Sequence, residues 1–212
     1  EKEQAEDYRF IPDPDLPVMV VEKLLAEKIR KELPEPPHEK TGRLVKQHNI
    51  EQDTAEVLSQ NREIAEFYEK VLGYGIGKKL ASYWVTIELL RILNWNKKQL
   101  DEVSIKPEHF AELLKMIEKK EITETAAKNL LNKFIPKSFS PKQKIKDIRR
   151  ITDAPEIEKI CKEVIKNNKK AAEDYKSGEK KALDFLLGKI MQETKGRADS
   201  KIAREILIKL LG

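Results

Sequence analysis

The chain has 212 residues, of which 39% are hydrophobic and 37% charged, so it can bury a core in one or two domains beneath a densely ionic surface. No run approaches the roughly 18 apolar residues that span a bilayer, and the N-terminus lacks a basic-then-apolar signal pattern. A single cysteine, Cys161, excludes an internal disulfide. We therefore expect a soluble, cytoplasmic protein with no membrane partner, in which Cys161 is an ordinary core thiol.

Positive charge is concentrated in the C-terminal third of the chain. Residues 1–135 contain 22 Lys and Arg against 25 Asp and Glu, whereas residues 136–212 contain 20 against 12. The net charge of +5 therefore arises after residue 135. Such asymmetry favours an anionic partner there, although a solvated surface of ion pairs accounts for the charge equally well.

The first predicted element is an extended segment, Asp7–Pro17, which reads DYRFIPDPDLP. Its three prolines fix φ and remove N–H donors, so the segment should be extended and lean on a neighbour. The chain begins at Glu1 without methionine, and so short a segment cannot form a domain, so we expect a piece of a longer protein. Asp13 and Asp15 could serve as acid–base groups or magnesium ligands, but structural turn residues are the favoured interpretation.

Amphipathic periodicity then predicts a succession of helices and no strands. A stiff proline-rich run at 34–37 separates the first helix from the others. Asn61 and Thr123 suit N-caps, and Pro107 suits a first helical position. The predicted ranges are Glu22–Leu33, His38–His48, Asp53–Ser59, Arg62–Leu72, Lys78–Leu93, Pro107–Lys120 and Thr123–Phe134.

The glycine-rich stretch Gly73–Lys79, GYGIGKK, invites comparison with a phosphate-binding loop. The Walker pattern requires a glycine where Leu72 stands and a hydroxyl residue where Lys79 stands, and a strand should precede it. A turn between helices is therefore the favoured interpretation.

Histidines and tryptophans offer two further candidate sites. His38, His48 and His109 do not fall on one helix face with a third ligand nearby, so no metal site is predicted. Trp84 and Trp95 lie in or beside the most apolar predicted helix. We expect both to pack in the core, with base stacking as the alternative.

The sequence PKSFSP, Pro136–Pro141, is the predicted internal boundary, because proline and serine cluster where the charge balance changes sign. Beyond it we expect helices at about Pro155–Asn167, Glu179–Thr194 and Asp199–Leu211, the last capped by Asp199. A basic stretch opens this tail and is a candidate surface for an anionic partner. Its cations are Lys142, Lys144, Lys146, Arg149 and Arg150.

The most informative segment is Lys181–Asp199, KALDFLLGKIMQETKGRAD, which joins an apolar helix face to a cationic helix end. Gly196 tolerates the left-handed conformation of a helix C-cap. The apolar face comprises Leu183, Leu186, Leu187, Ile190 and Met191. The cations in and around this segment form the main candidate anion-binding set, which is Lys180, Lys181, Lys189, Lys195, Arg197 and Lys201.

Two segments, Asp7–Pro17 and Lys181–Asp199, resemble the GatB/YqeY family, which includes the B subunit of tRNA-dependent amidotransferases. The family tail carries a run of the form AL-FL-G--M--T-G-A. Lys189 departs from the pattern, since many members have glutamine there. The matching positions here are Ala182, Leu183, Phe185, Leu186, Gly188, Met191, Thr194, Gly196 and Ala198.

The resemblance implies an all-α chain of two small bundles that follow an extended remnant of an α/β catalytic domain. Residues 1–31 would end that catalytic (cradle) domain, 32–141 would form the helical domain and 142–212 the YqeY-like tail. ATP and magnesium would belong to the catalytic domain, so no catalytic residue and no cofactor are expected in this chain. The implied partners are tRNA, the amidase subunit and the small C subunit.

The implied parent enzyme converts Glu-tRNA(Gln) or Asp-tRNA(Asn) to the amide, using ATP and ammonia derived from glutamine. In this chain the main candidate set would contact tRNA, and the basic stretch at 142–150 would be a secondary contact. One alternative is the archaeal E subunit, although its inserted domain has no counterpart between Pro17 and Glu22. The other is a helical adaptor that binds protein through its apolar face.

Overall fold

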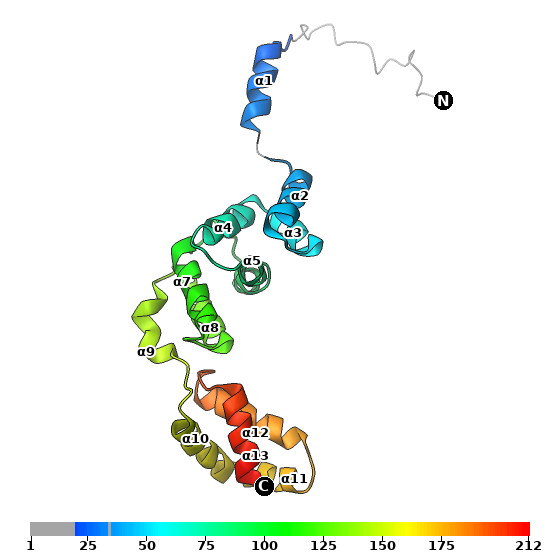
Figure 1. Cartoon of the computed structure of the whole chain (residues 1–212). Coiled ribbons are helices and arrows are strands. Elements are labelled where there is room, and N and C mark those ends of the chain that lie inside the picture. The colour runs from blue at the N-terminus through cyan, green and yellow to red at the C-terminus, as the bar shows by residue number, and fades with distance from the viewer. Residues whose placement is uncertain (1–19, 34) are drawn as a thin grey trace, which may run out of the picture. The chain divides into compact units, whose positions relative to one another are not determined.

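Figure 1 shows the computed structural model of the chain, which describes residues 20–33 and 35–212. These residues form helices joined by loops, and β-type pairing among them is confined to isolated bridges such as Ile151–Ala198. The predicted all-α fold is confirmed. The predicted extended segment Asp7–Pro17, with Asp13 and Asp15, lies outside the described residues.

The chain divides into two compact units, residues 1–36 and 37–212. In the first, α1 (Lys23–Glu32) has no buried side chain. None of the helices in the described part of the chain is long and apolar enough to cross a membrane. The helices of the second unit are α2 (Pro37–His48), α3 (Gln52–Ser59), α4 (Arg62–Leu72), α5 (Lys78–Tyr83), α6 (Leu90–Trp95), α7 (Pro107–Glu118), α8 (Glu124–Leu131), α9 (Ile145–Ile148), α10 (Ala154–Asn167), α11 (Lys169–Lys176), α12 (Lys181–Glu193) and α13 (Ser200–Leu211).

The first hydrophobic core is enclosed by α2 to α8, because each of these helices turns an apolar face inward. Trp84, Tyr68 and Phe110 are among its largest fully buried side chains. Side chains as far along the chain as Ile148 pack against this core, and a second core begins at Ile151. The domain boundaries at 31/32 and 141/142 stay predictions.

Helix starts follow the side chains that cap them. The side-chain oxygens of Asn61, Thr123 and Asp199 accept backbone N–H groups from the first turns of α4, α8 and α13. These bonds satisfy donors that have no partner within the helix. The three predicted N-caps are therefore confirmed, and α4 has the predicted bounds.

The most apolar predicted helix contains a π-helical turn, Trp84–Leu89, between α5 and α6. Trp84 packs in the core, but Trp95 is 85% exposed, so the prediction that Trp95 packs in the core is wrong. Helical periodicity explains the difference. Trp95 is in register with Tyr83 and Ile87, which are exposed, whereas the opposite side of the helix is buried.

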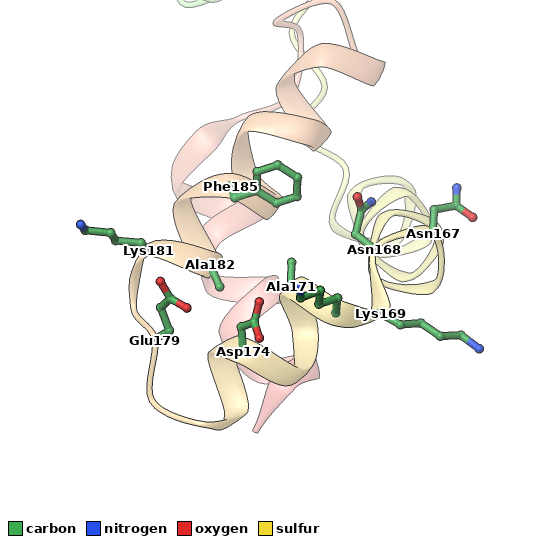
Figure 2. A pocket seen from close by; sticks show the side chains of 10 residues that line it. Asn167, Asn168, Lys169, Ala171, Asp174, Glu179, Lys181, Ala182 and Phe185 are labelled. Carbon is green, nitrogen blue, oxygen red and sulfur yellow. The ribbon is translucent and has the colours of Figure 1, made fainter.

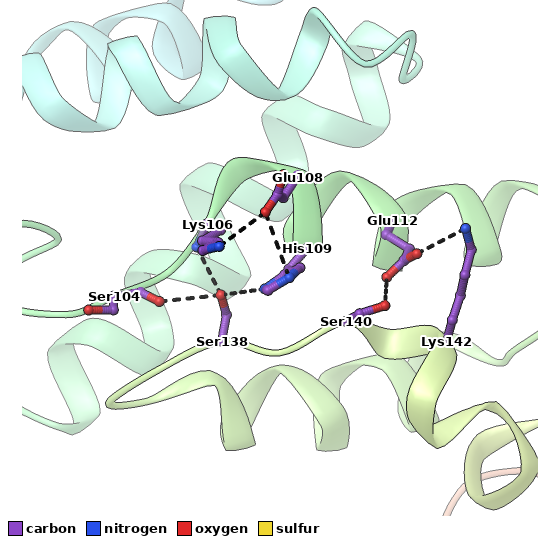
Figure 3. Close-up of polar contacts among 8 residues, drawn as sticks. All are labelled: Ser104, Lys106, Glu108, His109, Glu112, Ser138, Ser140 and Lys142. Atoms are coloured by element: carbon purple, nitrogen blue, oxygen red, sulfur yellow. Dashed lines mark hydrogen bonds and ion pairs between the residues drawn. The ribbon is translucent and has the colours of Figure 1, made fainter.

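The PKSFSP segment is fastened to α7 and is not an exposed linker (Figure 3). The Ser138 hydroxyl oxygen accepts the Lys106 N–H at 2.9 Å and lies 2.9 Å from Nδ1 of His109. The Ser140 hydroxyl donates to the Glu112 carboxylate on α7. Composition alone indicates a break between helices, but not that the serines bind the neighbouring helix.

The second core is enclosed by α10 to α13 and includes Ile157, Leu186 and Leu207. Cys161 is fully buried there, and burial raises the pKa of its thiol to about 11, as expected of an unreactive core thiol. The predicted helices omit α11, since Ala172 is the one side chain that this helix buries and its apolar periodicity is weak.

The turn after α12 lies in close contact with the start of α8. The Thr123 hydroxyl donates to the Gly196 carbonyl, and the Asn129 amide donates to the Lys195 carbonyl at 3.3 Å. Gly196 has a φ of +78°, and a Cβ at this position would lie 2.8 Å from Cβ of Thr125. Glycine is therefore required for two reasons, since L side chains avoid this φ and any side chain would collide with Thr125.

We expect Gly196→Ala to lower the free energy of unfolding by about 1–3 kcal/mol, because it adds both backbone strain and a collision. Gly188→Ala is the matched control. Gly188 lies inside α12, and a methyl group placed there would have nothing within 4 Å, so alanine should stabilise the helix by about 0.5–1 kcal/mol. Denaturant unfolding measures both, and equal stability of the two variants would contradict the docking role of Gly196.

Candidate nucleic-acid interface

The cations predicted in the tail fall at both ends of α12. Lys181, at its start, lines a recess of about 540 Å³ beside Phe185 (Figure 2). Lys189 lies over the Phe185 ring, with its Nζ 5.6 Å from the ring centroid. Lys180 precedes the helix and Lys201 occupies the first turn of α13, both exposed to solvent.

The recess in Figure 2 is also lined by two carboxylates, Asp174 and Glu179. Lys169 and Lys181 extend away from the recess, whereas Asp174 lies at its wall. Because the carboxylates would repel phosphate, this end of α12 is the weaker candidate for an anion site.

A second cleft, of about 660 Å³, lies where the tail meets the helical region. It combines Lys195 and Arg197 with Lys133, at the end of α8, and Lys146, on α9. Asp147 is the one acidic residue in its lining. We call this the junction cleft. Since its cations outnumber its carboxylates four to one, it suits phosphate groups better than the recess beside Phe185 does.

The turn that carries Lys195 and Arg197 is built by the end of α12. Lys195 has a φ of +53°, and the Gly196 N–H donates to the Met191 carbonyl at 2.7 Å, which closes the helix. Nε of Arg197 donates to the Thr194 carbonyl at 3.1 Å. These bonds place the two cations on either side of a fixed turn, as the sequence predicts from the position of Gly196.

The walls of the junction cleft are held together by backbone bonds. The Ile151 N–H donates to the Arg197 carbonyl at 2.9 Å, and the Asp199 N–H donates to the Ile151 carbonyl at 3.1 Å. On the other side, the Arg150 N–H donates to the Glu121 carbonyl at 2.8 Å. The strand-like bridge at Ile151 therefore ties the turn after α12 to the segment that follows α9.

Two members of the predicted basic stretch are engaged in ion pairs. Nζ of Lys142 lies 3.1 Å from the Glu112 carboxylate. Arg150 pairs with Asp199, and the two side chains are 25% and 10% exposed. Burial opposes ionisation of Asp199, but the bond from Arg150 and two backbone N–H groups lower its pKa below the usual value. The structure thus gives Arg150 a structural role, while Lys146 faces the junction cleft.

Lys133 is a cleft residue that the sequence does not predict. It belongs to the first 135 residues, whose net charge is negative, and no pattern links it to the tail. Only the docking of the turn after α12 against α8 brings it beside Lys195.

Comparison with known proteins places this geometry in a family. A sequence profile of the GatB domain matches residues 66–211. The chain belongs to the GatB/YqeY family. The matched region of this GatB/YqeY chain takes in both hydrophobic cores for most of their length, and the four cations of the junction cleft lie within it.

Several relatives are named as the B subunit of aspartyl/glutamyl-tRNA(Asn/Gln) amidotransferase. The protein of Methanococcus maripaludis strain C5 is 39% identical over 216 residues, which cover 98% of this chain and 46% of that protein. The Carboxydothermus hydrogenoformans protein is 40% identical over 97% of this chain and 43% of its own length. The Clostridium acetobutylicum protein that carries this name with the number 2 is 34% identical over 99% and 44%. The GatB/YqeY chain thus spans a little under half the length of these relatives.

We expect Asp199→Ala to lower the free energy of unfolding by about 1–3 kcal/mol, because it removes a helix cap and leaves Arg150 unpaired. Asp199→Asn keeps a capping oxygen and should lose less at pH 7. Since the folded-state pKa of Asp199 is lowered, the pair stabilises the fold above the unfolded pKa of about 3.9, and this contribution is lost as the pH falls through the folded pKa. The difference between wild type and Asp199→Asn should therefore shrink below about pH 4.

Asp184→Ala is the control for this effect. Asp184 pairs with Arg204 at an exposed position, with side chains 66% and 47% exposed, so its loss should change the stability by less than about 0.5 kcal/mol. Denaturant unfolding at about pH 7 and pH 3, on either side of the carboxyl titration, measures all three variants. An effect of Asp184→Ala as large as that of Asp199→Ala would refute the assigned role of Asp199.

Proposed function

We propose that this chain is the tRNA-binding C-terminal part of the B subunit of an aspartyl/glutamyl-tRNA amidotransferase, and that the junction cleft holds the tRNA backbone. The observation that carries the proposal is the convergence of Lys133, Lys146, Lys195 and Arg197, from separate elements, on one cleft. Cations spaced over a rigid concave surface suit a structured RNA, which proteins recognise largely by shape and phosphate position.

The parent complex would convert Glu-tRNA(Gln), Asp-tRNA(Asn) or both to the amides, using ATP, magnesium and ammonia derived from glutamine. Its catalytic groups would lie in a preceding domain, and its other subunits would be the amidase and the small C subunit in the cytoplasm. Within the described residues no group of three or more His, Cys, Asp and Glu side chains could hold a metal ion. Lys180, Lys181, Lys189 and Lys201 would add weaker contacts outside the cleft.

Two alternatives make different predictions about binding. The archaeal E subunit would also bind tRNA, but the relatives named above are B subunits that align along nearly the whole chain. A protein-binding adaptor would dock through apolar surface, and its affinity would respond little to salt. Affinity for RNA phosphates falls steeply as salt rises.

The Lys195→Ala, Arg197→Ala double variant should weaken binding to a tRNA(Gln) transcript and lower the slope of log affinity against log salt by about two, since each lost phosphate contact lowers it by about one. The matched control is Lys166→Ala, Lys209→Ala, which removes the same charge from exposed tail positions outside the cleft lining. Gel shifts from about 50 to 200 mM salt measure both slopes, and circular dichroism checks folding. Equal slopes for the two double variants would refute the cleft as the contact.

The purified chain alone should show no ATP hydrolysis and no amide transfer, because the proposal assigns both reactions to polypeptide outside it. Radiolabelled ATP and glutamine assays, with a complete amidotransferase complex as the positive control, measure this. Turnover above the buffer blank by the chain alone would contradict the assignment.

A further inference from the structure

Four exposed side chains repeat at intervals of four along the helix that runs from α5 to α6. They are Tyr83, Ile87, Arg91 and Trp95, and we call them the aromatic stripe. Trp95 is 85% exposed, Ile87 50% and Tyr83 44%. The other side of the same helix fills the first core, so packing within the described chain does not account for two exposed aromatic rings at one helical register.

The aromatic stripe is basic, although it lies in the acidic part of the chain. Residues 78–98 contain five Lys and Arg and a single acidic residue, Glu88. Glu88 is buried, and its carboxylate lies 2.9 Å from Nε of Arg91 and 2.7 Å from Nζ of Lys128. The carboxylate is thus neutralised within the fold, and the solvent-facing side of this helix presents rings and cations.

The aromatic stripe is continuous with the junction cleft. The Arg91 guanidinium donates to the Asn132 side chain at 3.0 Å, and Asn132 adjoins Lys133 of the cleft. Through α8, Lys128 pairs with Glu88 while the next residue, Asn129, donates to the Lys195 carbonyl. The two surfaces therefore share α8 and the residues that end it.

We propose that the aromatic stripe is a stacking platform for unpaired bases of the RNA whose phosphates occupy the junction cleft. This inference rests on the proposed function and extends its site. Aromatic rings beside cations bind bases in a manner tolerant of sequence, because every base offers a flat face. At the Tyr83 end, a recess of about 490 Å³ lined by Asn49, Thr86 and Ile87 adds hydrogen-bonding groups beside an apolar wall.

Charge favours RNA over a protein as the occupant. A surface that docks another subunit through Trp95 and Ile87 would gain nothing from the run of cations at 78–98, and cations at the centre of a protein interface must be paired or desolvated at a cost. Phosphates beside stacked bases would pair with those cations directly.

The test uses the full chain and two matched pairs of variants. Trp95→Ala and Tyr83→Ala remove a ring, whereas Trp95→Phe and Tyr83→Phe keep one. Each Ala variant should raise the Kd for a tRNA(Gln) transcript at least about fivefold and leave the salt slope unchanged, because no cation is lost. The Phe variants should bind within about twofold of wild type, and all four should unfold at similar denaturant concentrations.

Two further measurements examine stacking directly. Saturating tRNA should quench the emission of exposed Trp95 in the wild type but leave little change in Trp95→Phe, whose remaining Trp84 is fully buried. A blunt RNA duplex without unpaired bases should bind the wild type more weakly than tRNA, and Trp95→Ala should reduce that preference.

The outcomes separate this inference from the proposed function. If both Ala variants bind tRNA like the wild type while Lys195→Ala, Arg197→Ala binds more weakly, the stacking platform is refuted and the cleft stands. If the wild type fails to bind tRNA at about 50 mM salt, where phosphate contacts are strong, both are refuted. If the Ala variants keep tRNA affinity but lose binding to an amidase subunit, the stripe is a protein-docking surface and the inference is wrong.

Discussion

The contact between the Gly196 turn and the start of α8 is the constraint on which the candidate site depends. A residue with positive φ reverses the chain after α12, and the absence of Cβ lets this turn approach Thr125. The Thr123 hydroxyl then serves twice, since its oxygen caps α8 and its proton binds the Gly196 carbonyl. Without this approach, Lys195 and Arg197 would remain on the second core and Lys133 on the first, with no shared cleft between them.

Two buried ion pairs reinforce that arrangement on different sides of α8. Burial alone would raise the pKa of Glu88, but hydrogen bonds from Lys128 and Arg91 lower it. Asp199 is held in its ionised form by Arg150 and by backbone N–H groups in the same manner. Replacing such pairs with apolar residues often changes stability little, whereas removing one partner is costly. Their contribution here is therefore better described as fixing which elements meet, since each pair joins segments that the hydrophobic cores alone would allow to slide.

Local pattern is sufficient to predict most of the helices and insufficient to predict the surfaces they form. The bounds of α4 and the caps Asn61, Thr123 and Asp199 follow from apolar spacing and short-range hydrogen bonding, which a sequence displays directly. The prediction for Trp95 fails because hydropathy does not fix the helical register, which the π-helical turn shifts. The cleft is predictable only in part. Lys195 and Arg197 are marked by the glycine between them, but Lys133 joins them through tertiary docking that leaves no trace in neighbouring residues.

The junction cleft and the aromatic stripe would supply recognition terms of different physical origin. Phosphate contacts weaken with salt and carry no sequence information, so the cleft alone would bind many polyanions. Stacking depends little on salt but requires bases that are free of a duplex, so the stripe alone would bind single strands weakly. A folded tRNA is distinguished from both by presenting a rigid phosphate surface and unpaired bases at a fixed separation. Because Arg91 and Lys128 tie the stripe to α8, and the Gly196 turn ties the tail to the same helix, that separation is set by the packing of one short helix.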